Sequence, residues 1–129
     1  MVFFNDPVEV PNPPQRAVCV ALAMRDRLVP LQSGWRRRGF DLALGVGIAR
    51  GYATMGAIGF EGRWDYAAIG TVTNLAARLC SRALGGQILV SAAATAAVED
   101  LTELEAVGDL SLKRLARTVE TYSVVGLRA

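Results

Sequence analysis

The segment 67–79, AAIGTVTNLAARL, constrains the fold of this chain most, because it predicts a strand that runs directly into a helix. Beyond Gly70, apolar side chains recur at helical spacing, as expected of a helix face packed against a core. They are Val72, Leu75, Ala76, Leu79, Cys80 and Ala83. Asn74, Arg78 and Arg82 form a polar stripe on the opposite side. The stripe is either a solvated face or a ligand-binding pair, in which the amide orients a hydroxyl and the guanidinium takes a phosphate oxygen.

Length and composition predict one domain over residues 1–129, located in the cytoplasm. Although 52% of the residues are hydrophobic, the longest apolar run, 17–24, is far shorter than the ~20 residues of a membrane-spanning helix, and no signal segment begins the chain. The net charge of +2 is too small to predict binding to nucleic acid. Without histidine or a close pair of cysteines, the chain has neither histidine acid–base chemistry nor a zinc site.

A long helix is predicted over residues 15–38, with Pro30 opposite its apolar face and expected to kink or break it. The predicted apolar face consists of Ala17, Val20, Ala21, Met24, Leu28, Leu31 and Trp35. Arg36, Arg37 and Arg38, followed by Gly39, are typical of a helix C-terminus with cations at the negative end of the dipole. A basic patch for phosphate or nucleic acid is the alternative interpretation of these arginines.

The remaining pattern predicts an α+β fold with helices on one side of an antiparallel sheet. Ser91 is expected to cap a short alanine-rich helix, and both cysteines, Cys19 and Cys80, are expected to be buried reduced thiols. Strands are predicted over 42–49, 53–58, 64–69, 87–90, 103–112 and 119–125, with the last two forming a closing antiparallel pair.

Three motifs in order resemble the C-terminal portion of a class III adenylate/guanylate cyclase catalytic domain. They are GIARG at 47–51, RWDY at 63–66, and Gly70 followed by NLAAR at 74–78. The resemblance covers about residues 3–125, nearly the whole chain. It implies a ferredoxin-like, palm-type antiparallel sheet with helices on one side, lacking the first strands of the family.

The resemblance also implies an activity and roles for four residues. Family members cyclise ATP or GTP in head-to-tail dimers with Mg²⁺ or Mn²⁺, and the ribose 3′-oxygen attacks the α-phosphorus as pyrophosphate leaves. Asn74 matches the asparagine that positions the ribose, and Arg78 matches the arginine that stabilises charge on the α-phosphate. Lys113 resembles the lysine that meets the terminal phosphates. Ala67 stands at the purine-facing position, where its side chain offers no hydrogen bond to the base.

The resemblance places other parts of the family site before the position matched by Met1. Both metal-binding aspartates and the purine-reading lysine fall there, so no metal ligand is assigned in this chain, which is expected to be an N-terminally truncated domain, inactive alone. The missing strands would leave an open sheet edge and exposed apolar surface, for which a homodimer or strand-swapped dimer is the expected remedy. Two alternatives remain open: a non-catalytic dimerisation or regulatory module derived from a cyclase domain, and an artefactual truncation of an active cyclase.

Overall fold

The computed structural model describes residues 2–5, 9–52, 54–60, 63–110 and 119–127. Its longest element is helix α1 (Pro13–Arg37), which begins with prolines in its first turn and ends with Arg36 and Arg37 in its last. The helix continues through Pro30, so of the two outcomes expected at this proline, a kink or a break, the break does not occur. Among the described residues, no helix combines the length and hydropathy needed to cross a bilayer.

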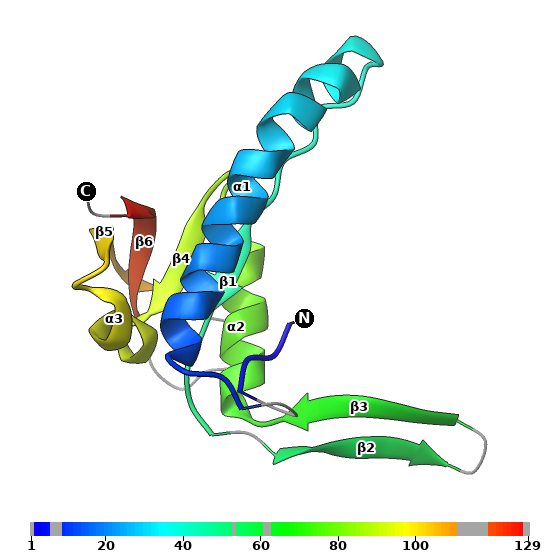
Figure 1. The fold of residues 1–129 in the computed structure, drawn as a ribbon, viewed down its shortest axis with the longest axis vertical. Helices are drawn as coiled ribbons and strands as arrows, with labels where there is room; N and C mark the ends of the chain where they lie inside the picture. Colours follow the sequence, from blue (N-terminus) through cyan, green and yellow to red (C-terminus); the bar gives the residue numbers. More distant parts are fainter. Residues whose placement is uncertain (1, 6–8, 53, 61–62, 111–118, 128–129) are drawn as a thin grey trace.

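A four-stranded sheet forms the centre of the fold, in the order β1-β4-β6-β5 (Figure 1). Strand β1 pairs in parallel with β4, whereas the β4–β6 and β5–β6 pairs are antiparallel. Helix α2 (Thr71–Arg82) precedes β4, and the short helix α3 (Ala92–Val98) follows it. The strand bounds are Val46–Ile48 for β1, Ile88–Ser91 for β4, Thr102–Leu110 for β5 and Val119–Leu127 for β6.

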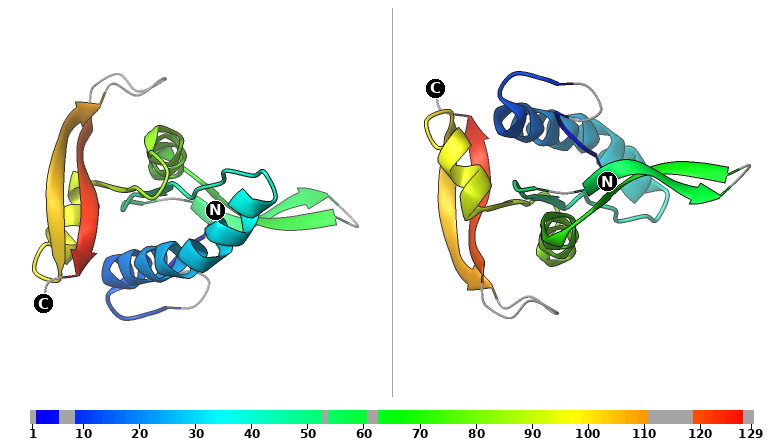
Figure 2. Two further views of the ribbon diagram at one scale, coloured as in Figure 1. Left: turned by 90° about the horizontal axis from the view of Figure 1, so that it is seen from above. Right: turned by 90° about the horizontal axis from the view of Figure 1, so that it is seen from below.

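The α+β class predicted from the sequence is confirmed, and two details of the sheet differ. The sheet is mixed rather than purely antiparallel, and helices cover both of its faces (Figure 2). Ile88 and Val90 pack with α1 and α3, whereas Leu89 between them packs with Leu79 of α2. Because successive side chains of a strand point to opposite faces, the continuous apolar run of β4 requires a cover on each side.

Strands β2 (Thr54–Phe60) and β3 (Arg63–Ile69) form a separate two-stranded sheet. Their register pairs Thr54 with Ile69 at one end and Phe60 with Arg63 at the other, close to the strand bounds expected from the sequence. The hairpin projects away from the four-stranded sheet (Figure 1). An isolated two-stranded hairpin is only marginally stable in water, so we expect this hairpin to be stabilised by packing against another surface.

The apolar face predicted for α1 is only partly correct. Its member Ala21 is buried, but Val20, Met24 and Leu31 are 41%, 40% and 52% exposed. Val18 and Leu22, which lie outside the predicted face, are buried in their place. The residues 17–24 are apolar on every side of the helix, so periodicity cannot distinguish the face that packs. We call Val20, Met24 and Leu31 the outer face of α1. The outer face of α1 is apolar surface that no described residue covers. Strand β1 lies at one edge of the sheet, and no described strand pairs with its outer side.

Both cysteines are exposed, so the prediction of buried thiols is also wrong. Cys80 lies at the border of the packed face of α2, and its thiol donates to the carbonyl oxygen of Gly45 at 3.5 Å. Cys19 lies on α1 next to Val18, whose side chain points into the core. Successive side chains on a helix point in directions about 100° apart, so a residue next to a buried apolar residue need not itself be buried.

Helix α2 can pack closely against β1 because Gly47 has no side chain. A Cβ atom there would lie 2.3 Å from the amide nitrogen of Cys80 and 2.5 Å from the carbonyl oxygen of Ala76, both in the backbone of α2. Backbone atoms of a packed helix cannot move aside as a flexible side chain can. Gly47 therefore sets how closely α2 approaches the sheet.

We predict that Gly47→Val lowers the free energy of unfolding by about 3 kcal/mol or more, because the valine pushes α2 away from β1. Gly34→Ala is the matched control, since a Cβ at Gly34 meets nothing within 4 Å and the position lies inside α1. The alanine is expected to stabilise the chain by ~0.5–1 kcal/mol. Urea denaturation followed by circular dichroism measures both changes. Equal stability of the two variants would contradict this account of the contact.

Candidate functional site

The start of α2 is fixed by the end of the hairpin. Strand β3 ends at Ile69, Gly70 is the N-cap residue, and α2 begins at Thr71. The hydroxyl of Thr73 donates to the carbonyl oxygen of Gly70 at 2.6 Å, and the Thr73 amide donates to the same oxygen at 3.2 Å. The predicted strand-to-helix turn is therefore confirmed, and its first helical turn is tied to the residue that precedes it.

Helix α2 packs on the sheet through the face predicted from the sequence. Leu79 is fully buried against Leu89 of β4, with Leu75 and Ala83 packed beside this pair. A Cβ at Gly51 would meet the Val72 side chain at 3.2 Å, so the first turn of α2 also lies close to the segment after β1. These contacts at both ends of the helix hold it at one rotation about its own axis.

Asn74 and Arg78 lie on α2 one turn apart and away from this packed face. Asn74 is exposed and Arg78 is half-buried. Neither side chain makes a hydrogen bond or an ion pair with another described residue. Ser81, on the same side of α2, only donates to the carbonyl oxygen of Ala77 at 3.1 Å. Helix α2 thus presents an amide and a guanidinium that make no polar contact within the described part of the chain.

The other two residues assigned from the sequence are located less completely. Ala67 lies on β3, opposite Gly56 of β2 and shortly before α2, and only its backbone is described. Lys113 lies outside the described residues. Within the described part of the chain, no three His, Cys, Asp or Glu side chains gather as metal ligands would.

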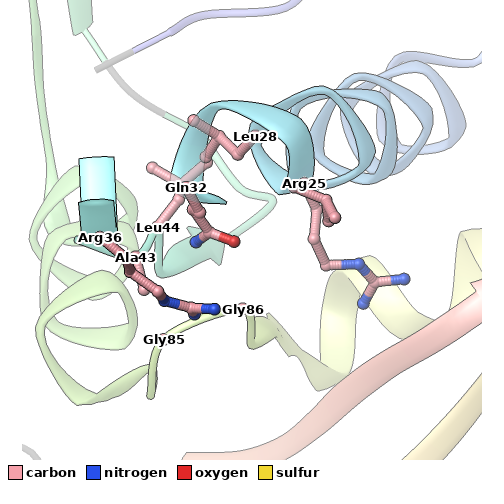
Figure 3. Close-up of a pocket in the computed structure, with 9 residues that line it drawn as sticks. Arg25, Leu28, Gln32, Arg36, Ala43, Leu44, Gly85 and Gly86 are labelled. Atoms are coloured by element: carbon pink, nitrogen blue, oxygen red, sulfur yellow. The ribbon is translucent and has the colours of Figure 1, made fainter. Parts of the chain in front are cut away.

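A pocket of about 240 Å³ that sequence reasoning missed lies between α1 and the loops that lead into β1 and β4 (Figure 3). Its polar groups already have partners: Arg25 donates to the carbonyl oxygen of Val125 at 3.0 Å, and Gln32 donates to that of Leu42 at 3.0 Å. The guanidinium of Arg36 faces Asp41 at 3.5 Å. The lining residues come from three separate segments of the sequence, so no local motif could have predicted the pocket. None of the residues assigned to the cyclase site from the sequence lines it.

Comparisons with known proteins agree with the motifs carried by these elements. Residues 1–126 match the family model described as the adenylate and guanylate cyclase catalytic domain. Adenylate cyclase 1 of Rhizobium meliloti (strain 1021) is 30% identical over 127 residues, which are 96% of this chain and 19% of that protein.

Two solved structures share both the fold and part of the sequence. The adenylyl cyclase CyaB from P. aeruginosa superposes with a TM-score of 0.87 at 34% identity, over 97% of this chain and 66% of that one. The guanylyl cyclase Cya2 superposes with a TM-score of 0.89 at 28% identity, over 97% of this chain and 64% of that one. The chain thus spans about a fifth of the curated relative and just under two thirds of these solved chains. It belongs to the family of adenylate and guanylate cyclase catalytic domains.

Proposed function

We propose that this chain supplies the asparagine–arginine wall of a shared nucleotide cyclase site, in cytoplasmic cyclic nucleotide signalling. The observation that carries the proposal is the presentation of Asn74 and Arg78 by α2. The helix is held against the sheet through Leu79 and Gly47, while both polar side chains have no polar partner among the residues that the structure describes. Preorganised polar groups of this kind stabilise a transition state because they need no rearrangement when charge develops.

In the proposed reaction, the ribose 3′-oxygen of ATP or GTP forms a bond to the α-phosphorus. The bond from that phosphorus to the bridging oxygen of the β-phosphate breaks, and pyrophosphate leaves with the electron pair. The proton of the 3′-hydroxyl is released to solvent. Asn74 would hydrogen-bond the ribose and hold the 3′-oxygen in line, while Arg78 would take the negative charge that grows on the α-phosphate oxygens. A planar guanidinium suits this role because its donors match phosphate geometry.

The rest of the site is proposed to come from outside these 129 residues. Because the described residues hold no fitting metal cluster, we derive no metal-dependent step from this chain. A partner domain, or sequence outside residues 1–129, would supply the acidic residues that bind Mg²⁺ or Mn²⁺. Lys113 is proposed to meet the terminal phosphates. The methyl group of Ala67 cannot hydrogen-bond a base, so we propose that other residues choose between ATP and GTP.

Two uncovered surfaces support dimerisation as part of this proposal. The β2–β3 hairpin forms its own sheet away from the body, and the outer face of α1 exposes Val20, Met24 and Leu31. Exposed apolar patches beside an open strand edge are typical of interaction surfaces. We infer that a second copy covers them, as a homodimer or by strand exchange.

We predict that residues 1–129 alone convert neither ATP nor GTP. Mixing them with a cyclase domain that keeps its metal-binding acids but has lost its own asparagine and arginine should restore activity. Asn74→Ala or Arg78→Ala should reduce the restored rate by ~10²–10³-fold, the loss expected for one transition-state contact. Cyclic nucleotide formed by the mixture, measured by chromatography, checks this.

Ser81→Ala is the matched control, because Ser81 lies on the same side of α2 and bonds only within the helix. Its restored rate should equal that of the unmodified chain. If a mixed dimer forms but its activity stays at background, the Asn–Arg wall is not functional in this protein. The chain would then be a non-catalytic dimerisation or regulatory module.

We further predict a dimer at ~10 µM by size-exclusion chromatography with light scattering. Met24→Lys should shift it toward monomer, because burying an unpaired ammonium in an apolar interface is costly. Its helical signal should be unchanged, since Met24 lies on the exposed side of α1. A monomer of the unmodified chain under these conditions would contradict the proposed self-association.

A further inference from the structure

The end of α1 forms a projecting basic and apolar surface that the proposed cyclase site does not use. We call residues 35–42, WRRRGFDL, the α1 apex. The eight residues contain three arginines and one aspartate, a net charge of +2 that equals the charge of the whole chain. Phe40 and Leu42 within it are 59% and 53% exposed. Cationic and large apolar side chains are therefore concentrated on one small projection.

The apex is ordered by backbone hydrogen bonds. The Gly39 amide donates to the carbonyl oxygen of Arg36 at 3.0 Å, and the Phe40 amide donates to that of Trp35 at 2.9 Å. With Gly39 at φ +88°, this is the Schellman arrangement that ends a helix in a fixed turn. Gln32 holds the returning segment against α1 through its bond to the carbonyl oxygen of Leu42. The exposure of Phe40 is therefore built into an ordered turn.

Charge and position together identify a partner for this surface. Asp41 faces Arg36, whereas Arg37 and Arg38 have no carboxylate partner among the described residues. The apex lies at the opposite end of the molecule from the β2–β3 hairpin (Figure 1). Helix α2 begins directly after this hairpin. A flat anionic surface that contacts the apex would therefore lie at the opposite end of the molecule from the first turn of α2.

We propose that the α1 apex docks this chain on an anionic lipid bilayer, with Phe40 and Leu42 entering the headgroup region and Arg37 and Arg38 contacting acidic headgroups. Aromatic and leucine side chains partition favourably into the membrane–water interface. Each arginine near an anionic membrane surface strengthens binding about fivefold. A nucleic acid is the less favoured partner, because its phosphate backbone offers nothing to exposed phenylalanine and leucine side chains.

Flotation of residues 1–129 with vesicles tests the proposal. In 0.1 M salt the chain should bind vesicles of phosphatidylcholine with 30% phosphatidylserine, and not vesicles of phosphatidylcholine alone. Salt at 0.5 M should weaken the binding, because it screens the arginines. Arg37→Gln with Arg38→Gln should weaken it by about 30-fold, and Phe40→Ser by about tenfold.

The matched control removes two arginines far from the apex, by Arg16→Gln with Arg50→Gln, and should bind within about twofold of the unmodified chain. Circular dichroism of each variant establishes that its helices are retained. Binding that is absent from acidic vesicles, or that is lowered equally by the control pair, would overturn the proposal. So would retention on duplex DNA instead of vesicles, or apex variants that lose self-association without lipid, since the apex would then be an interface between copies.

Discussion

The close approach of α2 to β1 is the contact on which the rest of this structure depends. Gly47 makes it possible, because any side chain there would collide with the backbone of α2 at Cys80 and Ala76. The approach lets Leu79 reach Leu89 and bury the second face of β4. Because one face of α2 packs on β4, its opposite face must point away from the sheet. Asn74 and Arg78 lie on that opposite face. Packing and the candidate site are therefore set by the same glycine.

The sequence was most informative where two sides of an element differ in chemistry. Helix α2 alternates a packed face with a polar stripe, and both its existence and its orientation could be predicted. Helix α1 carries apolar residues on every side between positions 17 and 24, so its existence could be predicted but only part of its buried face could. The choice between Val18 and Val20 was made by the sheet and α3, which no local pattern describes.

Strand bounds show the same limit. Residues 42–49 read as one strand, yet only Val46–Ile48 pairs with β4. The carbonyl oxygens of Leu42 and Leu44 accept hydrogen bonds from Gln32 and Gly86 instead, which lie in other segments of the chain and cannot be identified from the residues of the strand itself. Ser91 holds the N-cap position of α3 as predicted, but its buried hydroxyl makes no capping bond. Within the candidate site, the placement of Asn74 and Arg78 followed from spacing, whereas their roles rest on family resemblance.

The most direct test of the central claim is a crystal structure of residues 1–129 bound to a cyclase domain that keeps its acidic residues, with a non-reactive ATP analogue. In that complex we expect α2 to keep its present contact with β1. We also expect the Asn74 amide about 3 Å from a ribose oxygen and the Arg78 guanidinium about 3 Å from an α-phosphate oxygen. A bound nucleotide with both side chains turned to solvent would contradict it.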